Sequence, residues 1–253
     1  LLVKYLNKVV LVTGGSAGIG AATAELFAKE GATVAIVGRN ETKLNAVVKR
    51  CQKYGANTLA IKADVSKDEE AESIVQKTVD KFGKLDVLVN NAGILRVSGI
   101  LADNFLETYD EVMNINIRGP VRITHFAVPH LIKTKGNIVN VSSIAGTWAC
   151  TKRPNNISYR TSKAALNHFT RSVALELAPH GVRVNSISPG PVSTDIRNRL
   201  DINLDMLVQM TALQRLSETG EIANLIVYVA SDIAKGITGS DYVIDNGMLP
   251  KIK

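Results

Sequence analysis

Short runs of β-branched and other apolar residues alternate along the chain with longer stretches of helical periodicity. The apolar runs lie at Val9–Val12, Thr33–Val37, Thr58–Ile61, Asp86–Val89, Asn137–Val141, Arg183–Ser188 and Asp241–Asp245. The helical stretches lie near residues 19–30, 41–54, 67–82, 106–134, 158–178 and 219–231. This alternation predicts a doubly wound α/β fold, in which about seven parallel strands are covered by helices on both faces.

Several element boundaries carry a local signal of their own. Gly31 follows the first helical stretch and suits a left-handed helix stop, and Asn40 precedes the second stretch and is expected to cap it. Pro120 and Pro129 lie inside the 106–134 stretch, so that helix is expected to kink or to be split.

The segment 192–217 differs in composition from the rest of the chain, because charged residues are mixed there with Leu and Met. We expect an amphipathic insertion that forms a lid over a substrate pocket, and an ordinary pair of surface helices is the alternative. Because α/β chains of about 200–250 residues often fold as one unit, residues 1–253 are expected to form a single domain.

The net charge of +7 raises the question of nucleic-acid binding, but the 30 basic residues are scattered and the chain has one Trp. We therefore expect a solvated basic surface with a modest attraction for anionic ligands, and no nucleic-acid partner. Cys51 and Cys150 lie in different elements and form no CxxC pattern, and the four histidines form no i, i+4 pair. Neither a disulfide framework nor a metal site is expected.

The longest early apolar run is Val9–Val12, which is broken by Lys8 and Thr13. It is too short for a membrane span or for the core of a signal peptide. We therefore expect a cytoplasmic enzyme without a membrane span.

The segment Thr13–Gly20, TGGSAGIG, directly follows the first apolar run and opens a helix. This context distinguishes a phosphate-binding loop from a chance match, although a tight structural turn is the alternative. Glycines let the backbone approach a pyrophosphate, and the helix N-terminus offers unpaired N–H groups and a positive dipole end. The sequence predicts a Rossmann-like dinucleotide site formed by Gly14, Ser16, Gly18, Ile19 and Gly20.

The end of the second strand bears on the choice of cofactor. An acidic residue there would bond the ribose 2′-hydroxyl, whereas this chain has Arg39-Asn40 and no carboxylate before Glu41. A guanidinium fits a phosphate with two donors, so Arg39 and Asn40 predict NADP(H) rather than NAD(H), with a plain surface cation as the alternative. Ala17 adds no second basic residue, and Asp64 is placed to accept a hydrogen bond from the adenine amino group.

Tyr159 and Lys163 are four residues apart on an expected helix, so their side chains share a face. A free tyrosine has a pKa of about 10, and a nearby cation lowers such a pKa by about 1–3 units. Tyr159 is therefore expected to act as a general acid–base on a carbonyl or an alcohol, with Ser143 bonded to the substrate oxygen. A YxxxK pair alone is weak evidence for a catalytic site, because it occurs by chance on many helices. The evidence is stronger here because the pair follows the phosphate loop in the chain.

These motifs, taken in order, resemble those of the short-chain dehydrogenase/reductase family, of the common single-domain type. The resemblance covers nearly the whole chain. It rests on TGGSAGIG (13–20), Asp64-Val65, NNAG (90–93), NIRG (116–119), SSIAG (142–146), YRTSK (159–163), PGPVSTD (189–195) and ITGSDYVIDNG (237–247).

The resemblance implies a role for each catalytic position. Asn116 holds a water and links Lys163 to solvent as a proton relay, with Asn114 as a rival for that position. Ser143 orients the substrate carbonyl and Tyr159 is the acid–base. Lys163 lowers the pKa of Tyr159 and bonds the nicotinamide ribose.

The resemblance also implies the cofactor contacts outside the glycine loop. Asn90 has a mainly structural role between the central strands. The adenosine side is lined by Asp64, Val65, Asn91, Ala92 and Gly93, and the nicotinamide end by Pro189, Gly190, Val192 and Thr194.

The resemblance implies a small-molecule carbonyl or alcohol substrate. It also implies a homo-oligomer, either a tetramer or a dimer, joined through the 106–134 and 158–178 helices and the last strand. The segment 147–158 is longer than is usual in the family and should border the substrate.

A 3-oxoacyl carrier-protein reductase is the alternative activity, although those enzymes present basic residues where this chain has Thr134 and His180. A non-catalytic dinucleotide-binding regulator is an alternative of another class, but such a protein should lose Tyr or Lys from the motif.

Overall fold

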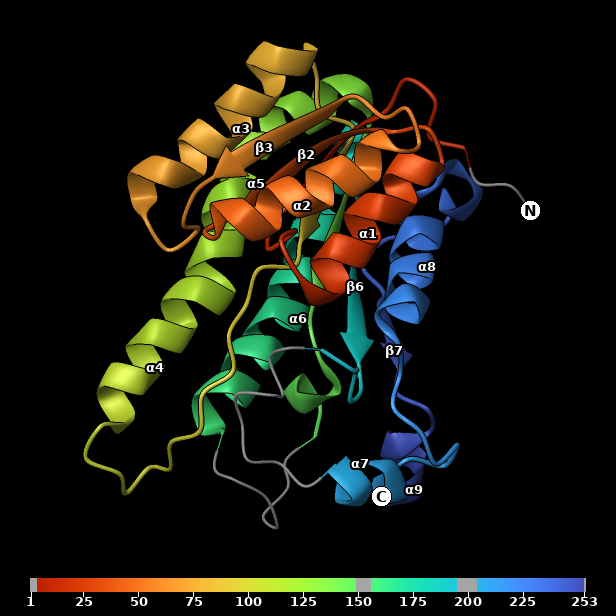
Figure 1. Cartoon of the computed structure of the whole chain (residues 1–253). Coiled ribbons are helices and arrows are strands. Elements are labelled where there is room, and N and C mark those ends of the chain that lie inside the picture. Colours follow the sequence, from red (N-terminus) through yellow and green to blue (C-terminus); the bar gives the residue numbers. More distant parts are fainter. Residues whose placement is uncertain (1–3, 149–155, 195–203, 253) are drawn as a thin grey trace.

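The computed structural model describes residues 4–148, 156–194 and 204–252, and it contains a seven-stranded parallel sheet (Figure 1). The strands run in the order β3-β2-β1-β4-β5-β6-β7, which confirms the expected doubly wound α/β fold. Their bounds are β1 Val9–Val12, β2 Thr33–Gly38, β3 Thr58–Lys62, β4 Val87–Asn90, β5 Asn137–Val141, β6 Arg183–Pro189 and β7 Asp241–Ile244.

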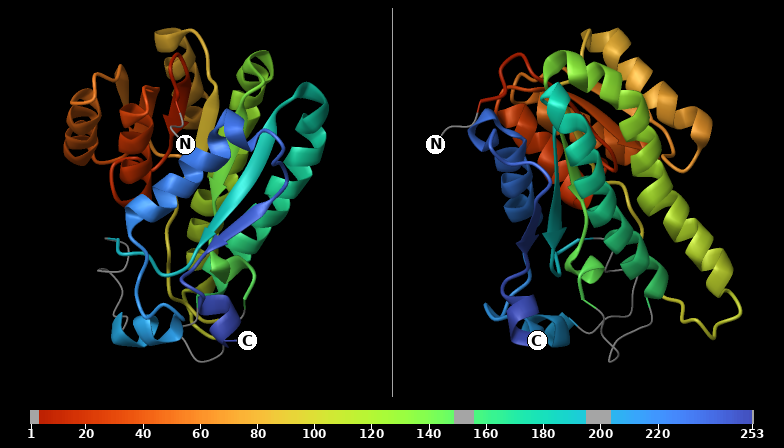
Figure 2. Two further views of the ribbon diagram at one scale, coloured as in Figure 1. Left: turned by 90° about the vertical axis from the view of Figure 1, so that its right-hand side faces the viewer. Right: turned by 180° about the vertical axis from the view of Figure 1, so that it is seen from behind.

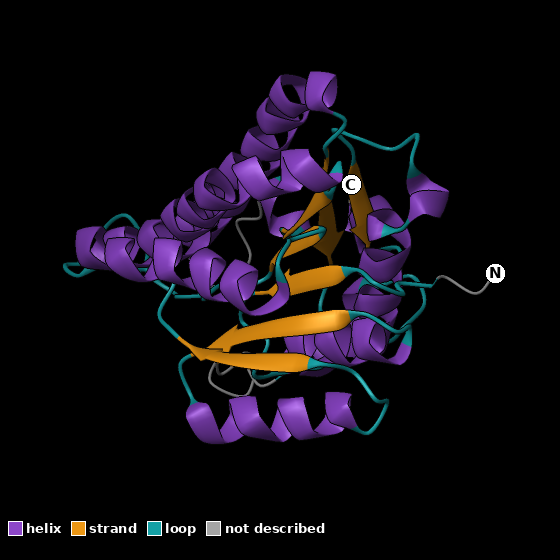
Figure 3. Cartoon of the chain, turned by 90° about the horizontal axis from the view of Figure 1, so that it is seen from above, coloured by secondary structure: helices purple, strands orange, loops and turns teal. Residues whose placement is uncertain are grey.

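Helices cover both faces of the sheet, as the view along its edge shows (Figure 3). One face packs against α1 (Gly18–Lys29), α2 (Glu41–Gln52) and α8 (Thr219–Ala230). The other face packs against α3 (Asp68–Phe82), α5 (Gly119–Thr134) and α6 (Ile157–Leu177).

The apolar strands explain this two-sided burial, because successive side chains point to opposite faces. In β1, Val10 and Val12 join the core under α1, whereas Val9 and Leu11 join the core under α3 and α5. A strand with four buried apolar residues in succession fits only between two layers of helices.

The order of the strands reverses between β1 and β4, since β1 lies between β2 and β4 while the later strands extend the sheet away from β2. In an open parallel sheet, the connections at such a switch point leave on opposite faces and open a crevice at the carboxyl ends. The sequence motifs 13–20 and 90–93 follow β1 and β4, so both lie at this crevice.

Shorter elements connect or follow the main strands and helices, and α4, α7 and α9 can be followed in Figure 1, with further views in Figure 2. They are α4 (Phe105–Met113), the π-helix η1 (Asn114–Arg118), α7 (Leu204–Met210), α9 (Met248–Ile252) and the 3-10 turns η2 (Ile144–Gly146), η3 (Ala178–His180) and η5 (Asp232–Ala234). Within the 192–217 segment, the structure describes α7 and a parallel bridge between Val192 and Ser217, while residues 195–203 lie outside its described part.

The boundary signals behave largely as expected. Gly31 has a φ of 90°, and the Asn40 side chain accepts a hydrogen bond from the Lys43 amide at 2.9 Å. The 106–134 helix is split at η1, which ends two residues before Pro120. Pro120 lies in the first turn of α5, where an amide donor is not needed, and Pro129 lies within α5 without ending it.

A ladder of buried amides joins the central strands to the helices beneath them. The Asn90 amide on β4 donates to Thr124 Oγ1 at 3.2 Å and to Asn140 Oδ1 at 2.9 Å. The Asn140 amide on β5 donates in turn to Thr170 Oγ1 at 2.9 Å. This arrangement agrees with the structural role expected of Asn90.

No helix in the described ranges is long and apolar enough to cross a membrane.

Gly136, at the start of β5, provides a test of the packing between strands. A Cβ built there would lie 2.3 Å from the Asp86 carbonyl oxygen, so Gly136→Ala should destabilise the fold by about 2 kcal/mol. The control is Gly220→Ala in α8, where a Cβ meets no described atom within 4 Å and the change should be neutral or stabilising by up to about 1 kcal/mol. Urea unfolding measures both, and equal stability of the two variants would contradict the contact.

Candidate active site

The glycine loop joins the carboxyl ends of the three strands at the switch point. The Thr13 amide donates to the Val89 carbonyl at 3.0 Å, and the Gly15 amide donates to the Val37 carbonyl at 2.9 Å. Gly14 and Gly18 have φ values of 63° and 54°, which favour glycine. The loop therefore has a defined shape set by its backbone.

Two glycines are also required by close packing. A Cβ on Gly20 would lie 2.4 Å from the Gly14 carbonyl oxygen, and a Cβ on Gly14 would lie 2.8 Å from the Ala92 Cα. The N-cap of α1, Ala17, offers no side-chain hydrogen bond to the first turn. Because the first N–H groups of the helix are not capped by a side chain, they suit an anion such as a pyrophosphate.

Asn91 and Thr13 support the glycine loop through their side chains. The Asn91 amide donates to the Thr13 carbonyl at 2.9 Å and to the Gly14 carbonyl at 3.2 Å. The Thr13 hydroxyl accepts from the amides of Asn91 and Ala92 at 3.0 and 3.1 Å. Thr13 was not singled out from the sequence, although its place at the head of the glycine motif could have indicated it.

A cavity of about 130 Å³ lies beside the loop, at the carboxyl ends of β2, β3 and β4. Seven of the residues expected at the cofactor line it: Gly14, Ser16, Arg39, Asp64, Val65, Ala92 and Gly93. Ile94 and Ile115 also line it and were missed, since isolated apolar residues carry no motif. Because the adenosine side of the cofactor is expected from the sequence at these residues, this cavity is called the adenosine pocket.

The rim of this pocket carries opposite charges. An Arg39 guanidinium nitrogen lies 3.7 Å from an Asp64 carboxylate oxygen, and the Arg39 side chain is 63% exposed. Burial raises the pKa of Asp64, but hydrogen bonds from the Ser66 amide and hydroxyl together with the charges of Arg39 and Lys67 outweigh it, so the pKa falls below its ordinary value. Asp64 is therefore an ionised acceptor at neutral pH, and Arg39 is accessible to a phosphate.

Tyr159, Lys163 and Ser143 are brought together by α6 and the end of β5. Ser143 lies close enough to Tyr159 to lower the pKa of its phenol. The Lys163 ammonium donates to the Val141 carbonyl at 2.8 Å and lies 5.7 Å from the centre of the Tyr159 ring. Ser143 is fixed as the N-cap of η2, since its hydroxyl accepts from the Ala145 amide at 3.1 Å.

The electrostatics of the pair differ from the sequence expectation. Burial raises the pKa of Tyr159, and the hydrogen bond from Ser143 only partly opposes this effect. Burial also lowers the pKa of Lys163 to about 8. The Lys163 ammonium lies beside the Tyr159 ring and is itself desolvated. In the protein alone, the effect of burial on the Tyr159 pKa is therefore larger than the effect of the Lys163 charge.

Asn116 lies next to this group, on η1. Its side chain is bonded to both the amide and the carbonyl of Ile94, at 2.8 and 2.9 Å, and it donates to Ser162 Oγ at 3.0 Å. A Cβ on Gly93 would lie 3.3 Å from Asn116 Oδ1 and 3.6 Å from Lys163 Nζ, so only a glycine separates these two side chains. Asn114 instead donates to the Ser66 carbonyl, which favours Asn116 for the relay position.

The residues expected at the nicotinamide end follow β6. The Ser143 hydroxyl donates to the Pro189 carbonyl at 3.5 Å, which places this segment beside the catalytic group. The methyl group of Thr194 lies 3.4 Å from the position of a Cβ on Gly18, so Thr194 faces the glycine loop. The structure thus places the two ends of the expected dinucleotide site within one crevice.

Arg160, next to Tyr159, was also missed by the sequence reasoning. Its guanidinium donates to Asn156 Oδ1 at 2.6 Å and to the Trp148 carbonyl at 3.3 Å, and it lies 5.6 Å from the Trp148 ring centre. Trp148 and Asn156 belong to the 147–158 segment, whose residues 149–155 lie outside the described part of the chain.

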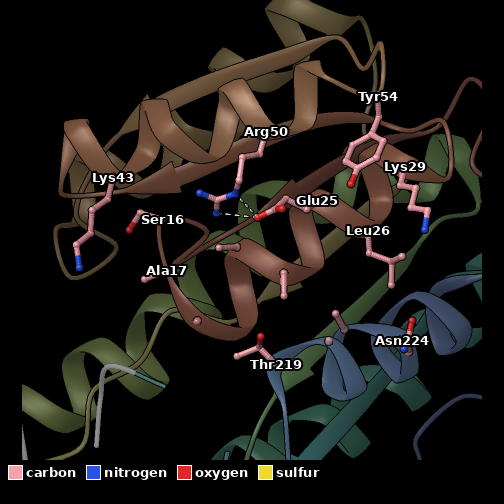
Figure 4. A pocket seen from close by; sticks show the side chains of 15 residues that line it. Ser16, Ala17, Glu25, Leu26, Lys29, Lys43, Arg50, Tyr54, Thr219 and Asn224 are labelled. Carbon is pink, nitrogen blue, oxygen red and sulfur yellow. Dashed lines mark hydrogen bonds and ion pairs between the residues drawn. The ribbon is translucent and has the colours of Figure 1, made fainter. Parts of the chain in front are cut away.

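A larger surface groove of about 640 Å³ follows the outer side of α1, between α2 and α8 (Figure 4). Its wall holds the Glu25–Arg50 ion pair, with Tyr54 and Lys29 nearby, and it touches the glycine loop only at Ser16–Gly18. Since its wall is formed by α1, α2 and α8, it lies apart from the catalytic side chains and is not the site of chemistry.

The described residues contain no group of three or more His, Cys, Asp or Glu side chains placed to hold a metal ion.

Known proteins match this chain over almost its whole length. A family model described as enoyl-(acyl carrier protein) reductase matches residues 14–249. The 3-oxoacyl-(acyl-carrier-protein) reductase FabG of Thermotoga maritima is 36% identical over 245 residues, which cover 96% of this chain and 98% of that protein. An uncharacterized oxidoreductase of the same organism is 40% identical over 252 residues, covering 96% of this chain and 98% of that protein.

Solved structures agree with these relatives. A short-chain type dehydrogenase/reductase from Mycobacterium marinum superimposes with a TM-score of 0.93 at 32% identity, covering 98% of this chain and 97% of that chain. A short chain dehydrogenase from Burkholderia cenocepacia, solved in complex with NADP, superimposes with a TM-score of 0.91 at 34% identity, covering 96% of this chain and 98% of that chain. With the fold, the glycine loop and the Ser–Tyr–Lys arrangement in place, this chain belongs to the short-chain dehydrogenase/reductase family of oxidoreductases.

Proposed function

We propose that this protein is an NADP(H)-dependent oxidoreductase that interconverts a carbonyl and an alcohol. The observation that carries the proposal is the grouping of Tyr159 with Ser143 and with the Lys163 ammonium, which lies 5.7 Å from the centre of the Tyr159 ring. This group lies at the edge of the sheet that also forms the adenosine pocket. A proton donor and a dinucleotide site at one crevice are what hydride transfer to a carbonyl requires.

The residues of the crevice fit a phosphorylated dinucleotide. Glycine is required at two positions where the backbone meets neighbouring atoms, and the first turn of α1 has no side-chain cap. Arg39 is exposed at the rim of the adenosine pocket and suits a 2′-phosphate, which favours NADP(H) over NAD(H). A structural relative was solved in complex with NADP.

The bound cofactor supplies or accepts the hydride, and this chain's own residues handle the proton. Tyr159 gives a proton to the substrate oxygen in reduction and takes it back in oxidation, and Ser143 bonds that oxygen and orients it. Lys163 holds the nicotinamide ribose, and its charge favours the ionised form of Tyr159. Asn116 connects Lys163 to the path of proton resupply.

Reduction of 3-oxoacyl thioesters is a narrower candidate for the activity. The observation that favours it is that several relatives 35–36% identical to this chain carry the name 3-oxoacyl-(acyl-carrier-protein) reductase. Thr134, one of the positions where such enzymes are expected to be basic, uses its hydroxyl internally to donate to the Leu85 carbonyl at 2.7 Å. The homo-oligomer, the cytoplasmic location and the lid over the substrate stay predictions.

The first test removes the proposed acid–base. Tyr159→Phe should lower kcat for NADPH-dependent reduction by about 10²–10⁴-fold, because the general acid is lost, while NADPH binding stays within about twofold. The assay is NADPH oxidation with acetoacetyl-CoA and a panel of ketones, quinones and aldehydes. Tyr228→Phe, at an exposed site on α8, is the control and should be unaffected. Full activity of Tyr159→Phe would refute the catalytic assignment.

The second test concerns the choice of cofactor. Arg39→Asp should lower the ratio of kcat/KM for NADPH to kcat/KM for NADH by about tenfold or more, since a charge-assisted contact to the 2′-phosphate becomes a repulsion. Arg50→Ala, which breaks the Glu25 ion pair in the outer groove, should leave the ratio unchanged. An unaltered ratio in Arg39→Asp would exclude a phosphate contact.

The third test uses the lowered pKa of Lys163, which burial places at about 8. A lysine contributes its positive charge below its pKa and loses it above, so kcat/KM for NADPH should fall as the pH rises through about 8. Arginine keeps its charge to above about pH 12, so Lys163→Arg should lack this alkaline limb even where its overall rate is lower. An identical limb in both proteins would assign it to another group.

A further inference from the structure

One wall of the adenosine pocket is the loop 64–68 that follows β3, and this loop is organised by its own polar groups. The Asp64 carboxylate accepts from the Ser66 amide at 3.0 Å and from the Ser66 hydroxyl at 2.7 Å. The Asp64 amide donates to the Glu70 carboxylate at 2.6 Å, which ties the start of the loop to α3. These bonds orient Asp64, but they leave the outward carbonyl of Ser66 without a partner inside the loop.

That carbonyl is held from outside the loop, by α5 and η1. Arg122 on α5 donates to the Ser66 carbonyl at 2.9 Å, and the amide of Asn114 on η1 donates to the same oxygen at 3.2 Å. Arg122 also donates to Asn114 Oδ1 at 3.4 Å and forms an ion pair with Asp68. We call Ser66, Asn114 and Arg122 the loop brace.

The helix does not need the brace in order to stay docked. Ile123, Ala127 and Leu131 of α5 are buried in the core on the same face of the sheet. Removing these apolar side chains would cost far more stability than removing one polar contact at the helix start. Yet the Arg122 side chain is only 13% exposed, and burying a guanidinium is costly unless its donors are used.

The brace lies directly behind the pocket. Val65, between the two anchored residues Asp64 and Ser66, lines the cavity, and so does Ile115, the neighbour of Asn114 on η1. A Cβ on Gly119 would lie 3.1 Å from the Val65 carbonyl oxygen, so the loop also packs closely against the first turn of α5. A shift of the loop by a few tenths of an ångström would therefore move the pocket wall.

We propose that Arg122 is a positioning residue for the adenine end of the cofactor, acting through the Ser66 carbonyl and Asn114 to fix the loop that carries Asp64. The inference rests on the proposed function, because it assumes that the pocket holds the adenosine of NADP(H). Among the described residues, the polar contacts of the Arg122 side chain go to the loop and η1, so its effect is on affinity for the adenosine half and not on the chemical step.

The experiment compares Arg122→Met with a matched control, Arg118→Met. Arg118 is one helical turn away and pairs with the same Asp68 carboxylate at 3.0 Å, but its side chain is 63% exposed. It is a control because, in the described part of the chain, the side chains that donate to the Ser66 carbonyl are those of Arg122 and Asn114. Binding of NADPH and of 2′,5′-ADP, which lacks the nicotinamide half, is titrated by calorimetry without substrate, and kcat is measured at saturating NADPH.

We expect Arg122→Met to weaken both ligands by about tenfold, which corresponds to about 1.4 kcal/mol, and to leave kcat at saturation unchanged. Arg118→Met should bind as the unmodified protein does. Arg122→Lys, which retains one donor, should fall between them, and Asn114→Ala should weaken both ligands in the same direction if Arg122→Met fails to fold.

Unchanged affinity of folded Arg122→Met for both ligands would overturn the proposal, as would equal losses in Arg118→Met, because a general charge effect would then suffice. A fall in kcat with unchanged affinity would also overturn it. Failure of the unmodified protein to bind NADPH and 2′,5′-ADP would overturn the proposed function itself, so the two failures are distinguishable.

Discussion

The rest of the structure depends on the burial of both faces of the parallel sheet. Because β1, β4 and β5 are wholly buried, their faces are closed to a ligand. The loops at the carboxyl ends are where the backbone can leave the core, and the switch point between β1 and β4 opens a crevice there. The glycine loop, the adenosine pocket and the catalytic side chains all lie at this edge for the same topological reason.

Within the crevice, desolvation sets the electrostatics. Lys163 is buried and lies beside the Tyr159 ring, with its ammonium bonded to the Val141 carbonyl, so its own positive charge is costly and its pKa is lowered to about 8. Tyr159 has a raised pKa for the same reason. A neutral Tyr159 phenol, next to a Lys163 ammonium whose pKa is close to neutral pH, suits proton donation to an alkoxide. The protonation states of both groups depend on the charges that a ligand brings into the crevice.

Much of the fold could be predicted from the sequence because each signal is local. The seven apolar runs match the seven strands to within a residue or two at each end, and the caps at Gly31 and Asn40 were readable from single residues. The split of the 106–134 helix was expected, and it lies at the π-helix 114–118, which ends two residues before Pro120. Pro120 has no amide donor and its ring crowds the carbonyl four residues earlier, which lies within this π-helix. The supporting contacts of Thr13 and Arg122 were missed because their partners, Asn91, Ala92 and Ser66, are distant in the sequence. Arg160 was missed although its partner Asn156 lies only four residues away.

By itself, the sequence determined the order of strands and helices, the glycine loop and the presence of a Tyr–Lys pair on one helix, since these follow from periodicity and from spacing along one element. Only the tertiary structure decided which side chains meet. It placed Asn116 rather than Asn114 beside Lys163, bonded the Asn91 side chain to the glycine loop, and added a desolvation that raises the pKa of Tyr159 in the protein alone. The physical reason is that proximity across elements and desolvation are properties of packing, which no local pattern encodes.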